Sequence, residues 1–225
     1  MKALLAILIL APGIAMAECR LALSLALDVS SSVNAAEYEI QKGGLANALR
    51  DPEIRAAALS PPGSVYLATY EWSGWQQQDL VIAWTRLDDE AAIDAFADKL
   101  DRHRRTYAEF STALGHAVDY GAQYFAYLPE PCAEHVIDVS GDGVNNDGFG
   151  PDGLWDSPLL ARVTVNGLVI KGAEPDPEPY YRTRVIWGPG SFLMVARNGF
   201  DDYAEMIKGK LLRELEPNML LGERR

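Results

Sequence analysis

Apolar runs and amphipathic segments alternate along most of this chain. Residues 21–28 form an almost continuous apolar run, which is typical of a central parallel strand that is buried on both faces. The pattern predicts further strands at residues 64–71, 79–86, 136–140, 163–170 and 191–196. It predicts helices at residues 34–50, 89–102, 112–127 and 200–215, and a short helix around residues 159–160.

The order of these elements predicts the class of fold. The strands at 64–71 and 79–86 are joined by a short connection at Ser73-Gly74, so they should pair antiparallel. The other strands mostly alternate with helices, which favours a parallel sheet covered by helices on both faces. We therefore expect an α/β fold with one antiparallel edge strand, formed by a single domain at residues 18–225.

Cap and turn residues mark the ends of several elements. Asn34 and Glu37 have the spacing of a capping box at the start of the first helix, and Asp51-Pro52 predicts its end. Segments rich in glycine, aspartate, asparagine or proline predict loops at residues 141–153 and 172–179.

The first residues have the pattern of an export signal. A lysine precedes an apolar run at residues 3–11 that is too short to span a bilayer, and Ala15-Met16-Ala17 is a small-x-small cleavage pattern. We expect residues 1–17 to be removed as a signal peptide, which favours the bacterial periplasm, with secretion as the other destination. A lipoprotein anchor at Cys19 is an alternative that Glu18 disfavours, because such sites take a small residue at that position.

Charge narrows the classes of partner. The formal net charge is −12, and loss of Lys2 with the signal peptide leaves −13. This charge argues against nucleic acid and anionic membranes as main partners, and most of it is expected to serve solubility. After the signal, no apolar run is long enough for an integral membrane segment.

Three oxygen-bearing side chains follow the first strand at alternate positions. Asp28, Ser30 and Ser32 stand where a buried strand breaks into a turn, and their carboxylate and hydroxyl oxygens suit a hard divalent cation. Taken alone, the same residues also fit a polar turn with a helix cap. The motif resembles the Asp-x-Ser-x-Ser opening of the metal-ion-dependent adhesion site of von Willebrand factor type A (VWA) domains.

This resemblance implies a doubly wound six-stranded sheet of order 3-2-1-4-5-6. The metal site would lie between strands one and four, where the strand order reverses. By resemblance, Ser30 and Ser32 bind the metal directly, and Thr112 binds it directly or through water. Asp28 and Asp142, which follow strands one and four, coordinate the ion or hold its water ligands.

The segment around the threonine departs from the family pattern. Thr112 begins a predicted helix, as the resemblance requires, but Phe110-Ser111 precedes it where many relatives carry a glycine. Ser111 and Thr106 therefore remain weaker candidates for the same ligand position.

Longer motifs narrow the resemblance to one bacterial family. Over essentially the whole mature chain, the sequence is similar to the exported VWA-type domains of the DUF1194 group. The similarity is carried by residues 139–146, 165–168, 180–181, 188–192 and 210–214. It implies the fold more firmly than the function.

Two loops are expected beside the metal residues. Four polar residues follow Asp142: Asn145, Asn146, Asp147 and Asp152. They are expected to form an acidic rim, a second cation site or a simple polar turn, of which the polar turn is favoured. The loop at residues 172–189 also follows a strand end on this face. Its aromatic residues Tyr180, Tyr181 and Trp187 are candidates for partner contacts, with packing onto the sheet as the alternative.

The two cysteines are predicted to form a disulfide. Cys19 lies nine residues before Asp28, and Cys132 lies ten residues before Asp142. If strands one and four are parallel neighbours, roughly 5 Å apart, the two cysteines meet at the edge opposite the metal site. A disulfide also fits an oxidising compartment.

The resemblance implies a metal-dependent protein-binding module rather than an enzyme. Two carboxylates and three hydroxyls leave a cation electrophilic, with a coordination position for a Glu or Asp of a protein partner. Mg²⁺ fits best, with Mn²⁺ or Ca²⁺ as alternatives. A metal-assisted hydrolase is the second hypothesis, although His103, His116 and His135 suggest no catalytic set. The third is a structural protein that Ca²⁺ stabilises without a metal-bridged partner.

Overall fold

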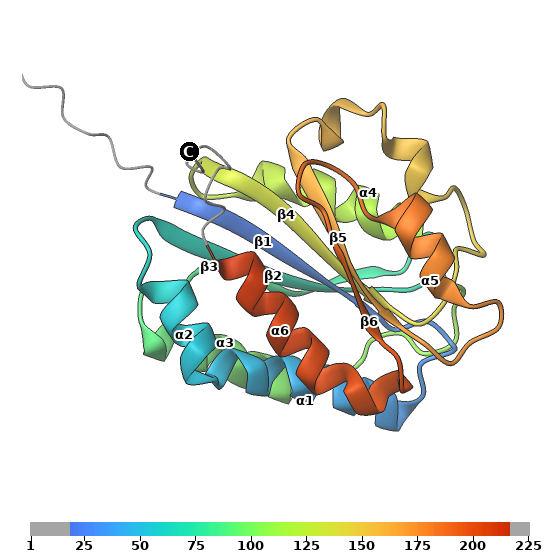
Figure 1. Cartoon of the computed structure of the whole chain (residues 1–225), viewed down its shortest axis with the longest axis horizontal. Coiled ribbons are helices and arrows are strands. Elements are labelled where there is room, and N and C mark those ends of the chain that lie inside the picture. The colour runs from blue at the N-terminus through green and yellow to red at the C-terminus, as the bar shows by residue number, and fades with distance from the viewer. Residues whose placement is uncertain (1–18, 217–225) are drawn as a thin grey trace, which may run out of the picture.

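A six-stranded sheet forms the centre of the structure, a computed structural model that describes residues 19–216 (Figure 1). The predicted signal peptide lies outside the described residues. The strand order is β3-β2-β1-β4-β5-β6, and only the β2–β3 pair is antiparallel, so the predicted fold class is confirmed. The strands are β1 (Cys19–Asp28), β2 (Ser64–Trp72), β3 (Gln78–Arg86), β4 (Cys132–Gly141), β5 (Val163–Ile170) and β6 (Leu193–Ala196).

Helices cover both faces of the sheet (Figure 1). One face carries α1 (Ala35–Arg50), α2 (Pro52–Leu59), α3 (Glu90–Arg102) and α6 (Tyr203–Leu215). The other carries α4 (Leu114–Tyr124) and the short α5 (Pro177–Tyr180). Short 3₁₀ helices lie at Phe125–Tyr127, Pro151–Leu154, Pro158–Leu160 and Gly199–Asp202, and a π-helical turn lies at Tyr181–Val185.

The alternation of side chains along β1 explains why this strand is apolar throughout. Leu23 and Leu25 belong to a core cluster with residues of α1, α3 and α6. Ala22 and Ala26 face the opposite cluster, which includes residues of α4. Because successive strand residues point to opposite faces, a central strand between two helical layers needs apolar residues at nearly every position.

Two helices that begin at a proline were not predicted from the sequence. Asp51-Pro52 does end α1, but Asp51 also caps a second helix, α2, by accepting a hydrogen bond from the Glu53 amide (2.9 Å). Pro177 likewise opens α5 inside the predicted loop at 172–179. In both cases proline occupies the first turn of a helix, where its missing N–H has no intrahelical partner to lose.

Other boundaries shifted at the ends of elements. Strand β4 starts at Cys132 instead of residue 136, because its polar first residues still pair with β1. Helix α4 begins at Leu114, so Thr112 lies in the preceding loop instead of in the helix. The capping box of Asn34 and Glu37 is confirmed.

The predicted disulfide is confirmed. Cys19 and Cys132 are partners in the β1–β4 register, and their sulfur atoms are bonded. The bond closes the edge of the sheet that lies opposite the carboxyl ends of these strands. It therefore ties the first described residue to the central strand pair.

A charged cluster is buried between α6 and the sheet. Lys210 Nζ lies 2.7 Å from Asp138 Oδ1 and 2.6 Å from Glu214 Oε1. The side-chain amide of Asn166 also donates to Glu214 Oε1 (2.8 Å). Burial, with the nearby charge of Asp138, raises the pKa of Glu214 from 4.5 to about 8. One lysine thus faces two carboxyls, and Glu214 holds its proton near neutral pH.

We expect the Glu214→Gln variant to gain stability relative to the wild-type protein as pH rises. The folded protein holds the Glu214 proton more tightly than the unfolded chain does. This contribution is therefore fully present below about pH 4.5 and is lost as pH rises through about 8. Glutamine has no such proton, so the difference in unfolding free energy should shift towards the variant by about 1–3 kcal/mol between pH 5 and 9. Urea unfolding at both pH values measures it, with the exposed Glu205→Gln as control; parallel pH profiles for all three proteins would contradict the expectation.

Candidate metal centre

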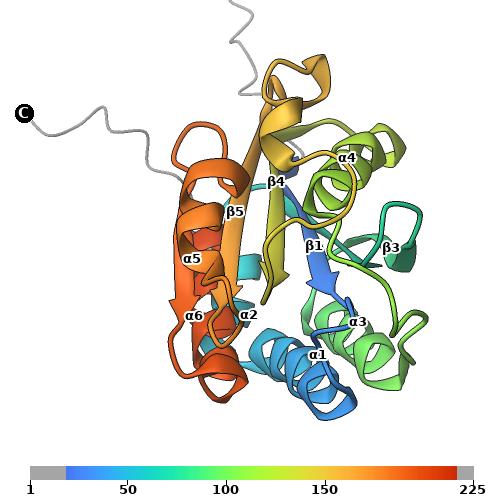
Figure 2. The ribbon, with the colours of Figure 1, turned by 90° about the vertical axis from the view of Figure 1, so that its right-hand side faces the viewer.

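The predicted metal residues gather at the carboxyl edge of the central strands. Strands β1 and β4 are parallel neighbours and run side by side to this edge (Figure 2). Asp28 is the last residue of β1, and Asp142 follows the last residue of β4. The strand order reverses between them, which is where open α/β sheets hold their ligands.

The Asp28 carboxylate is fully buried and only half satisfied. Its Oδ1 accepts a hydrogen bond from the Ser30 amide (2.7 Å), whereas its Oδ2 is buried without a hydrogen-bond partner. A Cβ atom at Gly141 would lie 2.7 Å from this Oδ2, so only glycine allows the end of β4 to approach so closely. The glycine before Asp142 thus brings the two carboxylates together.

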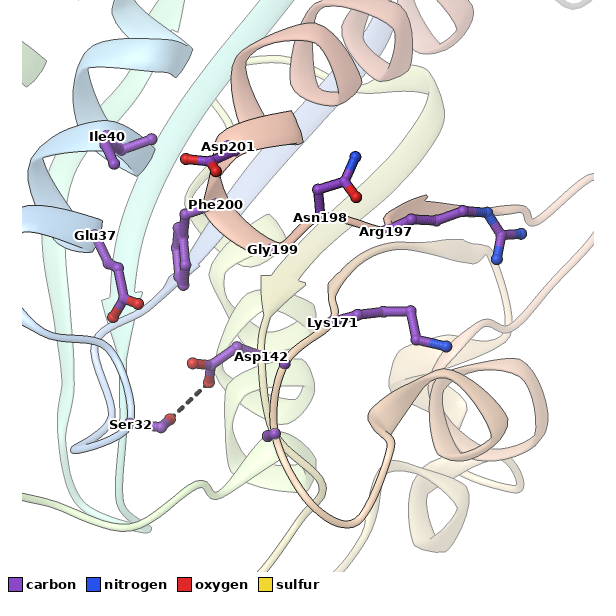
Figure 3. A pocket seen from close by; sticks show the side chains of 12 residues that line it. Ser32, Glu37, Ile40, Asp142, Lys171, Arg197, Asn198, Gly199, Phe200 and Asp201 are labelled. Carbon is purple, nitrogen blue, oxygen red and sulfur yellow. Dashed lines mark hydrogen bonds between the residues drawn. The ribbon is translucent and has the colours of Figure 1, made fainter.

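Hydrogen bonds connect three more of the predicted ligands. The Ser32 hydroxyl donates to Asp142 Oδ1 at 2.6 Å (Figure 3). The Ser30 and Ser32 hydroxyl oxygens lie 3.2 Å apart. Asp28, Ser30, Ser32 and Asp142 therefore form one continuous group of oxygens.

Thr112 lies beside the same group. A Cβ atom at Gly143 would lie 3.4 Å from its hydroxyl oxygen. Its amide donates to the Asn146 side chain (2.8 Å), and its carbonyl accepts from the Asn146 amide (2.9 Å). Of the two weaker candidates, Thr106 donates its hydroxyl to Asp79 (2.7 Å), and Ser111 is exposed. Thr112 is therefore the hydroxyl that the fold holds against the Asp142 turn.

Burial makes it unfavourable for the two carboxyl groups of the site to carry their negative charges, and a bound cation would offset those charges. Burial raises the pKa of Asp28 to about 7, and the negative charge of Asp142 adds to the effect. Burial also raises the pKa of Asp142. Within residues 19–216, no three His, Cys, Asp or Glu side chains gather in a metal-holding group, so the donor set here is two carboxylates with hydroxyls.

Arg105 supports the turn that carries the serines, although no motif in the sequence singles it out. Its guanidinium donates to three carbonyls of this turn, those of Val29 (2.7 Å), Ser30 (2.9 Å) and Val33 (2.7 Å). Arg105 belongs to the basic run at residues 102–105, which has the composition of a solvated loop. Charge alone gave no sign that one of these side chains points inward.

We expect the Arg105→Ala variant to bind a divalent cation about 10- to 100-fold more weakly than the wild-type protein. Groups that orient metal ligands without touching the metal typically contribute this much to affinity. Calorimetric titration with Mg²⁺ at a temperature well below unfolding measures the change. Arg104→Ala, which alters an exposed neighbour in the same loop, serves as control. Equal affinities for the two variants would contradict a positioning role for Arg105.

Further buried groups brace this edge. The Gln41 side chain donates to the Asp28 carbonyl (2.9 Å). Behind it, the buried Glu71 carboxylate accepts from the Tyr38 hydroxyl (2.6 Å) and lies 3.1 Å from His103 Nε2. No sequence motif marks these residues, because they come from three separate elements.

The polar residues after Asp142 form hydrogen bonds and an ion pair with neighbouring segments of the protein. Asn146 holds Thr112, as described above. The Asn145 side chain accepts a hydrogen bond from the Gly115 amide (3.3 Å) at the start of α4. Asp147 accepts from the Trp75 amide (3.1 Å), and Asp152 pairs with Arg184 (2.7 Å). Their contacts are those of a polar turn that connects β4, α4 and the β2–β3 hairpin.

The aromatic residues of the loop at 172–189 pack towards the sheet. Tyr181 is fully buried. Trp187 stacks on Trp155 with ring centroids 5.2 Å apart, and its backbone bonds with Val165 of β5. Tyr180 is half-buried. These contacts follow the packing alternative, and exposed aromatic residues lie elsewhere on this edge.

A cavity of about 620 Å³ opens beside Ser32 and Asp142 (Figure 3). Glu37 and Phe200 point towards Asp142 from one side, while Lys171 and Arg197 extend away on the other. The cavity gives a ligand access to the oxygens of the site from outside the protein.

The three histidines lie apart from this group of oxygens. His103 faces Glu71, and His135 stacks on Phe125 with ring centroids 4.6 Å apart. His116 stacks on Phe149 at 4.3 Å. The structure therefore places no histidine next to the Asp28 and Asp142 carboxylates.

Several solved structures have folds similar to that of this chain, and one of them is a von Willebrand factor type A protein. Proximal thread matrix protein 1 from the mussel byssus, in a form with a zinc-occupied MIDAS motif, is 14% identical, with a TM-score of 0.63 over 88% of this chain and 46% of that one. A von Willebrand factor type A protein from Catenulispora acidiphila is also 14% identical, with a TM-score of 0.60 over 88% and 43%. The manganese-loaded TRAP protein of Plasmodium vivax is 16% identical, with a TM-score of 0.55 over 87% and 74%. This chain spans less than half the length of the first two.

Sequence comparison identifies the family. No curated protein matches the sequence significantly. Residues 18–219 match the family described as "Protein of unknown function (DUF1194)". Since this match covers most of the chain, the chain belongs to the DUF1194 family, and its likeness to the solved structures shows the fold of a VWA domain.

Proposed function

We propose that this protein binds a divalent cation at its carboxyl edge and, through that cation, an acidic side chain of a protein partner. The ligands would be Asp28, Ser30, Ser32, Thr112 and Asp142. The observation that carries the proposal is the buried, unpartnered Oδ2 of Asp28, which lies next to a second carboxylate. An unpaired buried carboxylate is costly, and a bound cation removes that cost.

The donor set supports a hard cation. Carboxylate and hydroxyl oxygens suit Mg²⁺ best, and Mn²⁺ or Ca²⁺ are further candidates. The mussel protein with zinc and the Plasmodium protein with manganese are consistent with divalent ions in this fold. The cation would supply an electrophilic centre, while the protein's own carboxylates and hydroxyls hold it in place.

A partner carboxylate fits the charge and access of the site. Two carboxylates balance the charge of a divalent cation, and together with the hydroxyl ligands they would leave a coordination position at which a carboxylate from outside replaces water. The cavity beside Ser32 and Asp142 gives such a group a path. This role requires no catalytic side chain, so we propose a binding protein rather than an enzyme.

We also propose that the protein is exported, with residues 1–17 as its signal peptide and the bacterial periplasm as its location. The disulfide between Cys19 and Cys132 supports an oxidising compartment. Among the described helices, none is long and apolar enough to cross a membrane.

Affinity capture from periplasmic extract tests the proposed function. The immobilised protein should retain a partner in Mg²⁺, release it in EDTA, and fail to retain it when Asp28 is replaced by asparagine. The Asp119→Asn variant, which changes a carboxylate on α4, should capture the partner normally. Retention that is identical in all of these conditions would refute a metal-bridged partner.

A further inference from the structure

Exposed apolar side chains concentrate around the candidate metal centre. Seven large apolar residues in the described part of the chain are exposed by more than a third: Ile40, Trp75, Leu80, Phe110, Tyr127, Phe149 and Leu159. Four of them, Ile40, Trp75, Phe110 and Phe149, border the edge that carries Asp28 and Asp142, as the contacts below place them. Apolar side chains gathered around one site mark a contact surface more often than scattered ones do.

Three aromatic residues on one side of the site form what we call the aromatic rim: Trp75, Phe110 and Phe149, which are 52%, 41% and 39% exposed. The Phe110 carbonyl accepts a hydrogen bond from the amide of Ser31, inside the metal-binding turn (2.9 Å). Phe110 also lies close to the hairpin that carries Trp75. A Cβ atom built at Gly74 of this hairpin would be 3.4 Å from the Cβ of Phe110. The rim is therefore continuous with the proposed metal site.

His116 contacts two members of the aromatic rim, Phe149 and Trp75. His116 lies between Phe149 and Trp75, with ring centroids 4.3 Å and 6.3 Å away. The Trp75 amide is held by Asp147 (3.1 Å), on the same loop as Phe149. Rigid aromatic side chains on anchored backbone lose little entropy on binding, which suits a contact surface.

Apolar groups also line the cavity beside the site. Ile40, which is 40% exposed, and Phe200 line the cavity next to Ser32 and Asp142 (Figure 3). A ligand that enters the cavity would thus meet Ile40 and Phe200 beside the oxygens of the site.

The charges on this edge restrict the partner further. Glu37 and Asp201 line the cavity together with Lys171 and Arg197, and Lys171 is paired with Asp176 and Glu178. Glu109 is exposed next to Phe110, and the whole chain carries a net charge of −12. A strongly acidic partner surface would be repelled by these carboxylates. A single carboxylate among apolar neighbours is attracted by the cation and avoids this repulsion.

Building on the proposed function, we infer that the partner presents an acidic residue flanked by apolar side chains. The acidic residue would reach the metal, and its apolar neighbours would pack on the aromatic rim and on Ile40. The partner is then a protein segment in which a single carboxylate stands among apolar side chains, and not a tail rich in acidic residues.

Selection of peptides tests this inference without knowledge of the natural partner. A random peptide library displayed on phage is bound to the purified protein in Mg²⁺ and eluted with EDTA. The selected peptides should carry one Asp or Glu with apolar residues beside it. A synthetic peptide of selected sequence should then bind the Trp75→Ser and Phe110→Ser variants at least about tenfold more weakly than the wild-type protein, as expected for aromatic contact residues.

Matched variants separate the rim from general surface effects. Tyr127→Ser and Leu159→Ser remove exposed apolar side chains just before the amino ends of β4 and β5, away from the carboxyl edge that carries the metal turn, and should leave peptide affinity unchanged. The inference would be overturned if the EDTA-sensitive peptides showed no enrichment of apolar residues. It would also be overturned if they bound the Trp75→Ser and Phe110→Ser variants with full affinity. In either case the proposed function would still stand. A selection that yields no EDTA-sensitive peptide would overturn both.

Discussion

The Asp28→Asn variant is expected to lose at least about 100-fold in affinity for Mg²⁺. Asp28 is the most buried carboxylate of the site, and its Oδ2 has no hydrogen-bond partner within the described structure. Asparagine keeps the shape of the side chain but removes the charge that attracts the cation. Calorimetric titration of EDTA-treated protein with Mg²⁺ measures the loss.

The same variant should not be destabilised without metal. Above about pH 7 the wild-type protein must ionise Asp28 next to Asp142, and the variant avoids that repulsion. Thermal unfolding at pH 8 in EDTA should therefore give the variant a midpoint at least as high as that of the wild-type protein. Added Mg²⁺ should raise the midpoint of the wild-type and Asp119→Asn proteins, and leave Asp28→Asn unchanged. A lower midpoint for Asp28→Asn in EDTA would mean that Asp28 serves stability instead of metal binding.

Loss of the disulfide is expected to produce the largest change in stability. Cys19 and Cys132 are separated by 113 positions, and a bond across a loop of this size restricts the unfolded chain strongly. Replacing both cysteines by serine should lower the free energy of unfolding by about 3–5 kcal/mol. Thermal unfolding should then shift down by roughly 10 °C.

Reduction supplies the control for this variant. A reducing agent should lower the unfolding midpoint of the wild-type protein and have no effect on the double-serine variant. At temperatures well below the unfolding midpoint, the wild-type protein and the double-serine variant should bind Mg²⁺ with the same affinity. The reason is that the disulfide and the metal centre lie at opposite edges of the sheet. Equal midpoints for oxidised and reduced wild-type protein would contradict a stabilising role.

The sheet could be predicted because its signals are local and periodic. The apolar run of β1 and the short β2–β3 connection specify a buried central strand and an antiparallel edge. The strand order itself came from the resemblance carried by Asp28, Ser30 and Ser32. The disulfide prediction followed from that order, since the two cysteines meet only if β1 and β4 are neighbours.

The missed features depend on contacts between distant segments. Arg105 looks like any residue of a basic loop until the fold brings it against the carbonyls of the Ser30 turn. For Tyr181 and Trp187 the sequence left open partner contacts or packing onto the sheet, and the helical turns that precede Trp187 place both residues against the sheet. The exposed aromatic residues, Trp75 and Phe110, come from two other connections, and only the structure shows that they meet.

Anomalous diffraction from crystals grown with Mn²⁺ tests the central claim most directly. The account predicts one strong peak per chain at the carboxyl edge of β1 and β4, within coordination distance of oxygens from Asp28 or Asp142 and from Ser30 and Ser32. The peak should be absent in crystals of the Asp28→Asn variant. A map with no peak at this edge, or with a peak only in the loop that follows Asn145, would contradict the account.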